Sequence, residues 1–131
     1  LQERIERYNR FSHIAYDCLK GVKGVLVNRP TGSFYMSVCF EDGALNHRQR
    51  LPIDNPEIRE MIEKLVGVPG TEKDKRFVYY LLGSTGVCVV PLTSFASGLN
   101  GFRVTLLERD ENEFIKIMNT IAESIRRYLK S

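Results

Sequence analysis

The sequence is poor in the residues that build disulfide frameworks and metal centres. Its 131 residues include three cysteines, Cys18, Cys39 and Cys88, which lie far apart and form no C-x-x-C pair. An odd number of scattered thiols argues against a disulfide framework and predicts a reducing, cytoplasmic environment. The two histidines, His13 and His47, have no second ligand at the spacing of a zinc site. We therefore expect no metal centre and read both as plain surface or boundary residues.

Long apolar runs and a strong charge imbalance are missing as well. No stretch approaches the 18 or so apolar residues of a membrane span, and the charged start, LQERIERYNR, is unlike a signal peptide. Nineteen basic against sixteen acidic side chains leave a formal charge of +3. This charge is small and dispersed, so neither nucleic acid nor a membrane is expected as a partner. The absence of a starting methionine suggests a missing upstream piece.

What the sequence does contain is enough apolar material for one folded domain. Hydrophobic residues make up 43% and charged residues 27% of the chain, which is ordinary globular composition. The length corresponds to a single domain over 1–131. The periodicity predicts helices over 1–20, 55–67, 71–84 and from 110 onward, and strands over 22–28, 33–41, 87–90 and 102–107. This order predicts an α+β fold, with helices covering a small antiparallel or mixed sheet.

Local signals support several of these boundaries. Asn55 followed by Pro56 is typical of a helix start, because the asparagine side chain caps the first turn and proline fits its first position. The spacing of Thr71 and Asp74 predicts a capping box for the next helix. The wholly apolar segment 87–90 predicts a strand buried on both faces. The helix predicted over 55–67 has an apolar stripe that is expected to be buried, formed by Ile58, Met61, Ile62 and Leu65. The next helix is expected to begin with solvent-exposed basic side chains at Lys73, Lys75 and Arg76.

Motifs that carry chemistry are scarce. The sequence has no phosphate-binding loop, dinucleotide fingerprint, Gly-x-Ser-x-Gly or H-E-x-x-H motif. Polar residues gather in the expected loop 91–101, which leads into a strand where Arg103 shares a face with Thr105 and Leu107. A guanidinium among apolar residues needs an anion or water. Arg103 is therefore either a structural or water-facing residue, or a carboxylate receptor, since its planar fork matches two carboxylate oxygens.

Several short motifs, in order and spacing, resemble a known family. They are T-G-V-C-V-V-P at 85–91, S-F at 94–95, G-F-R-V-T-L-L at 101–107 and G-S-F-Y at 32–35. Together they resemble the end of a class I/II pyridoxal-phosphate (PLP) aminotransferase. Among the branches of that family, they resemble the alanine-aminotransferase-like branch most. Residues 1–20 resemble the helix that joins the large and small domains of that family. The resemblance covers essentially the whole chain.

The resemblance implies that this chain is the C-terminal small domain of a larger transferase of amino-acid metabolism. The Schiff-base lysine and the other PLP-binding groups would lie in a missing large domain, and no lysine here matches the family's lysine motif. The isolated chain is then expected to hold no cofactor, to contain no catalytic residue and to be inactive. The parent would be a cytoplasmic homodimer that uses amino-acid and 2-oxo-acid substrates.

Within this resemblance, Arg103 matches the arginine that grips the substrate α-carboxylate. Tyr35, Ser94 and Phe95 are possible contacts to substrate or to the domain interface. One departure is Leu92, which follows Pro91 where the family often has glycine, and which is expected to change the loop. The region 42–76 resembles the family only weakly. The alternatives are a free-standing α+β ligand-binding or regulatory module in which Arg103 holds an anionic effector, or a protein-interaction domain.

Overall fold

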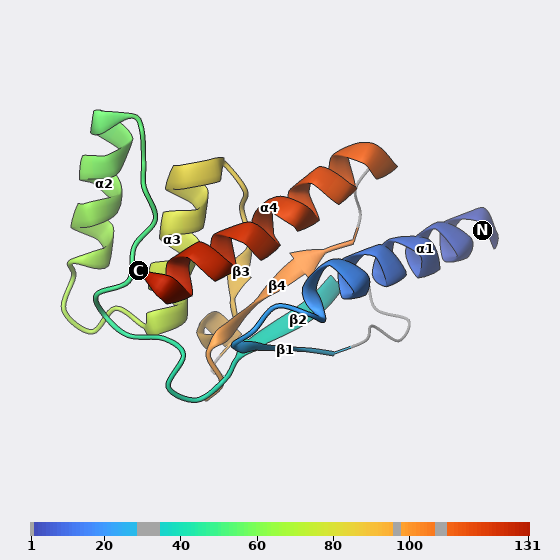
Figure 1. Cartoon of the computed structure of the whole chain (residues 1–131), viewed down its shortest axis with the longest axis horizontal. Coiled ribbons are helices and arrows are strands. Elements are labelled where there is room, and N and C mark those ends of the chain that lie inside the picture. Colours follow the sequence, from blue (N-terminus) through green and yellow to red (C-terminus); the bar gives the residue numbers. More distant parts are fainter. Residues whose placement is uncertain (1, 29–34, 96–97, 107–109) are drawn as a thin grey trace.

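The described part of the chain contains four α-helices and a four-stranded antiparallel sheet. The computed structural model describes residues 2–28, 35–95, 98–106 and 110–131. The elements, in chain order, are α1 (Gln2–Leu19), β1 (Val25–Val27), β2 (Tyr35–Phe40), α2 (Pro56–Val66), α3 (Lys73–Thr85), β3 (Val90–Pro91), the short 3-10 helix η1 (Leu92–Phe95), β4 (Gly101–Thr105) and α4 (Glu111–Lys130) (Figure 1). This confirms the predicted α+β class and the predicted order of helices and strands. The addition is η1, which lies in the segment expected to be a loop.

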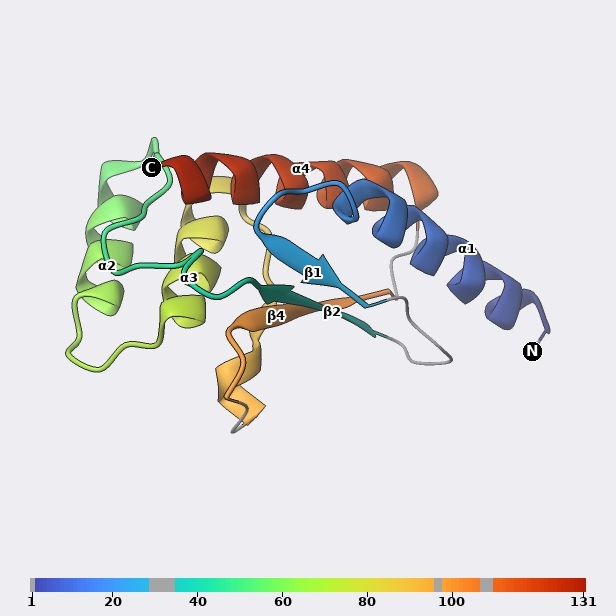
Figure 2. The same cartoon turned by 60° about the horizontal axis from the view of Figure 1, so that its bottom comes forward.

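The sheet has the strand order β1-β2-β4-β3, and every neighbouring pair is antiparallel. Residues 29–34, which connect β1 to β2, lie outside the described residues. Side chains alternate across β2 as its period of two predicts, so that Met36, Val38 and Phe40 are buried. On the paired strand, Phe102 and Val104 are buried in the same way. These residues face the helices, which lie over one side of the sheet (Figure 2).

The core lies between the sheet and helices α1, α3 and α4. The ring of Phe77 from α3 packs against Phe102 of β4 and against Tyr128 of α4, with centroid distances of 5.5 Å and 5.0 Å. At the other end of α4, Phe114 stacks on Phe11 of α1 at 4.7 Å. Along α4, one apolar stripe faces the core: Ile117 is partly buried, and the fully buried members are Phe114, Met118, Ile121, Ile125 and Tyr128.

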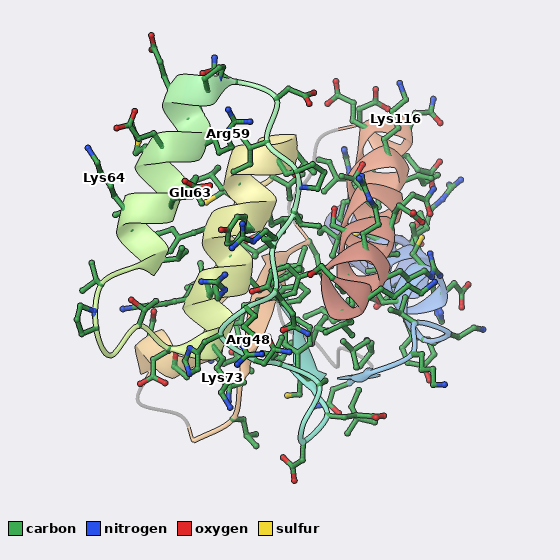
Figure 3. All side chains as sticks on the ribbon, turned by 60° about the vertical axis from the view of Figure 1, so that its left-hand side comes forward. Arg48, Arg59, Glu63, Lys64, Lys73 and Lys116 are labelled. Atoms are coloured by element: carbon green, nitrogen blue, oxygen red, sulfur yellow. The ribbon has the colours of Figure 1, made fainter. Side chains whose placement is uncertain are left out.

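Helix α2 begins and ends where its sequence signals predict. The side chain of Asn55 accepts hydrogen bonds from the backbone N–H groups of Glu57 and Ile58, and Gly67 forms the C-cap. The predicted burial is wrong, because Ile62 is the one buried residue of this helix. The exposed members of the expected apolar stripe are Ile58, Met61 and Leu65. Helix α2 packs on α3 at the edge of the molecule, and Lys64 projects away from α3 (Figure 3).

The predicted capping box at the start of α3 is also wrong. The N-cap is Glu72, whose side chain makes no capping hydrogen bond, and the hydroxyl of Thr71 donates to the carbonyl of Val68 instead. Asp74 turns inward and is fully buried. The expectation of a solvated basic cluster fails at Arg76, which is 8% exposed. The first turns of α3 therefore bury two charged side chains.

The third strand is shorter and later than the sequence predicts. It covers Val90 and Pro91, and it lies at the edge of the sheet. Val89 is buried, but Cys88 and Val90 are exposed, so the expectation of burial on both faces is wrong. The physical reason is that helices cover only one side of this sheet, so the alternate residues at its edge remain exposed.

Candidate functional site

One face of the sheet is not covered by any of the described α-helices (Figure 2). We call it the open face, and its residues are Leu26, Tyr35, Ser37, Cys39, Val90, Arg103 and Thr105. It is partly apolar, with Leu26 exposed to 61% and Val90 to 44%. The short helix η1 lies on this side of the sheet, opposite α4 (Figure 2). An exposed apolar sheet face bordered by a helix is typical of a surface that another protein segment covers.

Arg103 lies at the centre of the open face. It is paired with Ser37 on β2 and with Val90 on β3, so β4 holds it between two neighbouring strands. Its side chain is half-buried, and its Cζ atom lies 4.3 Å from the ring centroid of Tyr35. Tyr35 is opposite Thr105 in the register and therefore reaches Arg103 along the diagonal.

The contact with Tyr35 has a chemical consequence. A guanidinium on the face of an aromatic ring gains a cation–π interaction and keeps a preferred orientation. A fixed guanidinium presents two parallel N–H donors, which is the geometry that a carboxylate accepts. The open face can therefore recognise a carboxylate at this position, and the neighbouring apolar residues would strengthen the interaction by excluding water.

Of the other predicted site residues, the structure describes the side chains of Tyr35 and Ser94 but not that of Phe95. Tyr35 lies against Arg103, as described above. Ser94 is exposed in η1. Phe95 ends η1, but its side chain lies outside the part of the chain that the structure describes, as do Gly32, Ser33 and Phe34.

Asp74 is the residue that sequence reasoning did not place at this site. Its carboxylate is fully buried and accepts hydrogen bonds from the backbone N–H of Thr93 at 3.0 Å and from the Thr93 hydroxyl. It also accepts from the N–H of Gly101 at 3.3 Å. Asp74 thus joins α3 to η1 and to the first residue of β4. An acidic residue in the first turn of a helix was read as a local cap, and nothing in the sequence marks its partners 19 and 27 residues away.

The connection from β3 to β4 is also closely packed at Gly101 and Leu92. A Cβ atom on Gly101 would lie 2.1 Å from the carbonyl oxygen of Val38, so a larger residue cannot occupy this position without moving the strands. It would also lie 2.9 Å from the Cδ1 atom of Leu92, which is buried. Leu92, the departure noted in the sequence, begins η1 and packs over Gly101.

Thiols and metal-binding groups contribute little to this region. Burial raises the pKa of the Cys39 thiol on the open face. Burial, with a smaller contribution from the nearby Asp17, raises the pKa of Cys18. A search of the described residues finds no cluster of three His, Cys, Asp or Glu side chains that could hold a metal ion. Among the same residues, no helix is long and apolar enough to cross a membrane.

Two known proteins are similar to this chain, one in sequence and one in fold. No family model matches the chain. A protein of Methanocaldococcus jannaschii named as an uncharacterized aminotransferase is 51% identical over all 131 residues, and the chain covers 30% of that protein. An aspartate aminotransferase from Rhodobacter sphaeroides has the same fold, with a TM-score of 0.64 and 19% identity. The similarity covers 97% of this chain and 25% of that one.

The chain spans less than a third of the length of either protein. Its sequence aligns from end to end with one of them, and its fold aligns almost completely with part of the other. The resemblance found in the sequence is thus confirmed: this chain is similar over its whole length to a domain of an aminotransferase.

Proposed function

We propose that this chain is the C-terminal small domain of a PLP-dependent aminotransferase and that Arg103 binds the α-carboxylate of its amino-acid and 2-oxo-acid substrates. The observation that carries the proposal is the half-buried Arg103 at the centre of the open face, oriented by the ring of Tyr35. The similarity to an aminotransferase supports the same reading. Arg103 would hold the substrate by its carboxylate and leave the amino or oxo carbon free to react elsewhere.

The residues of the open face do not by themselves fit PLP. A Schiff base needs a lysine amine, and the open face includes none. All seven lysines of the sequence lie on helices or in the turn after α1; they are Lys20, Lys23, Lys64, Lys73, Lys75, Lys116 and Lys130. We therefore assign the cofactor to the part of the longer protein outside this chain.

The same proposal includes the partner of the open face. The exposed Leu26, Val90 and Tyr35 would be covered by the large domain that carries the cofactor. The substrate would then bind between the two domains, with its carboxylate on Arg103. The complete enzyme would be a cytoplasmic homodimer held together mainly through the large domain.

The test is kinetic and uses the full-length protein that carries this domain. Arg103→Ala should lower kcat/KM for the amino acid by about 30- to 1,000-fold, because a charge-assisted bidentate contact is lost. Arg103→Lys should restore only part of the activity, since a single ammonium cannot reproduce the fork. Arg127→Ala is the matched control, because it removes an exposed arginine on the last turn of α4.

Thermal stability measured on the same preparations separates binding from folding. If Arg103 serves only the fold, both variants should unfold at lower temperature while the folded fraction keeps normal kinetics. A folded Arg103→Ala protein with kcat/KM near that of the wild type would contradict the proposal.

A further inference from the structure

We propose that Asp74 is a positioning residue: it fixes the connection between β3 and β4 and thereby sets the position of Arg103 on the open face. The inference rests on the proposed function of Arg103. Asp74 belongs to α3, on the helical side of the sheet, and it is not expected to touch the substrate. Its effect would pass through the backbone of η1 and β4.

The hydrogen bonds of Asp74 define this role. They reach both described ends of the connection, because Thr93 lies in η1 and Gly101 is the first residue of β4. Gly101 precedes Arg103 by two residues in a strand that is paired on both sides. A shift at Gly101 would therefore move Arg103 along the sheet, and no flexible segment lies between them.

The burial of Asp74 makes these contacts specific. A carboxylate that is 0% exposed is stable only if its oxygens accept hydrogen bonds. Two N–H groups and one hydroxyl supply them, and the first turn of α3 places the charge near the positive end of the helix dipole. An asparagine at this position would keep one acceptor oxygen and turn the other group into an NH2 donor, so the two N–H groups and the Thr93 hydroxyl could no longer all donate to it, and the connection would have to rearrange.

Gly101 limits where the connection can move. Its backbone already lies against the carbonyl of Val38 and beneath the side chain of Leu92. The start of β4 is thus held by packing on two sides and by Asp74 on a third.

Arg76 offers a matched control on the same helix. It lies two residues after Asp74 and is also buried, but its Nε donates to the carbonyl of Gln49 at 2.8 Å. It therefore anchors the segment before α2 and has no recorded hydrogen bond to η1 or β4 among the described residues. Losing either residue should destabilise the domain, but only Asp74 should affect Arg103.

The experiment compares Asp74→Asn, Thr93→Val and Arg76→Met in the full-length protein, each alone and combined with Arg103→Ala. We expect Thr93→Val to lower kcat/KM for the amino acid by about 10-fold and Asp74→Asn by up to about 100-fold, mainly through KM. In the Arg103→Ala background the same changes should have no further effect, because the group that they position is gone. Arg76→Met should lower the melting temperature and leave kcat/KM within about 2-fold.

Hydrogen exchange provides a readout that does not depend on activity. The peptide that covers 98–106 should exchange faster in Asp74→Asn and Thr93→Val than in the wild type or in Arg76→Met. Thr93→Val is the milder change and keeps the test decisive if Asp74→Asn does not fold, since it removes one hydroxyl and retains the backbone hydrogen bond.

The outcomes distinguish this inference from the proposed function. Unchanged kcat/KM in Arg103→Ala would overturn the proposed function and this inference with it. A large loss in Arg103→Ala, together with normal kinetics and normal exchange in Thr93→Val and in folded Asp74→Asn, would overturn the positioning role alone. Equal losses in Asp74→Asn and Arg76→Met would also overturn it, because a general loss of stability would then explain both.

Discussion

Arg76 is a buried charged side chain that is held by a backbone carbonyl and an aromatic ring. The guanidinium of Arg76 donates to the carbonyl of Gln49 and lies 5.2 Å from the ring centroid of Tyr80. No carboxylate within ion-pair distance of Arg76 is recorded among the described residues. Gln49 in turn is held by Asn46 and Ala44, each at 2.8 Å. The segment before α2 thus depends on a buried cation.

The hydroxyl of Tyr128 gives a prediction for alkaline pH. Burial raises its pKa well above the ordinary value of 10, although the nearby Arg76 partly opposes the shift. The hydroxyl has no hydrogen-bond partner of acceptable geometry among the described residues. Because the folded state holds the proton more tightly, the free energy of unfolding should be unaffected by this group below about pH 10 and should fall above it, by up to about 1.4 kcal/mol per pH unit.

Tyr128→Phe isolates this effect. The variant should be about as stable as the wild type at pH 7, since the buried hydroxyl that it removes makes no well-formed hydrogen bond. It should lose less stability than the wild type as pH rises above 10. Urea unfolding of both proteins between pH 7 and 11 measures the difference, in which the groups common to both cancel. Parallel curves above pH 10 would show that Tyr128 ionises as easily in the folded state as in the unfolded one.

At the scale of the elements, periodicity predicted which residues share a face but not which faces are covered. It was sufficient for β2 and α4, because each has one face on the same core. It was misleading for α2, where a regular apolar stripe lies mostly in solvent because α2 packs only at its edge, on α3. The inward role of Asp74 was not predictable from local spacing, because its partners come from segments that only the fold brings together. Arg103 stands out in the sequence because it is a charge in an apolar strand, but its carboxylate-binding role came from the family resemblance and stays a prediction.

Helix α2 has a buried apolar side chain next to an exposed one, and this contrast leads to a prediction about stability. Ile62 is 3% exposed, whereas the adjacent Met61 is 61% exposed. Ile62→Ala should lower the free energy of unfolding by about 2–4 kcal/mol, because it leaves a cavity against Gly83 and Ile53. Met61→Lys should change it by less than about 0.5 kcal/mol. Urea unfolding would check both values, and a large effect of Met61→Lys would mean that α2 packs through its other side.

At the scale of the whole molecule, one side of the sheet serves stability and the other is the proposed recognition surface. The buried side of the sheet holds the core, and the open face presents Arg103 with exposed apolar residues around it. Under the proposed function this face would be only half of a binding site, because a carboxylate on Arg103 would still contact solvent on the opposite side. The chain covers 30% of an aminotransferase to which it is similar, and the remaining part is large enough to supply the other half.

This division predicts that the 131-residue chain, produced alone, folds but does not bind PLP at a defined site. Its lysines lie on helices and in a turn, and none of them is among the residues of the open face. Mixing with PLP, reduction with borohydride and peptide mass spectrometry would locate the adducts. We expect low occupancy spread over several lysines.

The full-length protein treated in the same way is the control, and it should give one adduct at full occupancy on a lysine outside this chain. The comparison tests the assignment of the cofactor separately from the role of Arg103, because neither arm depends on substrate. A single, fully occupied lysine in the 131-residue chain would contradict the assignment, since it would place a cofactor site on the helices or the turn rather than across the open face. The large domain would then not be needed to hold PLP.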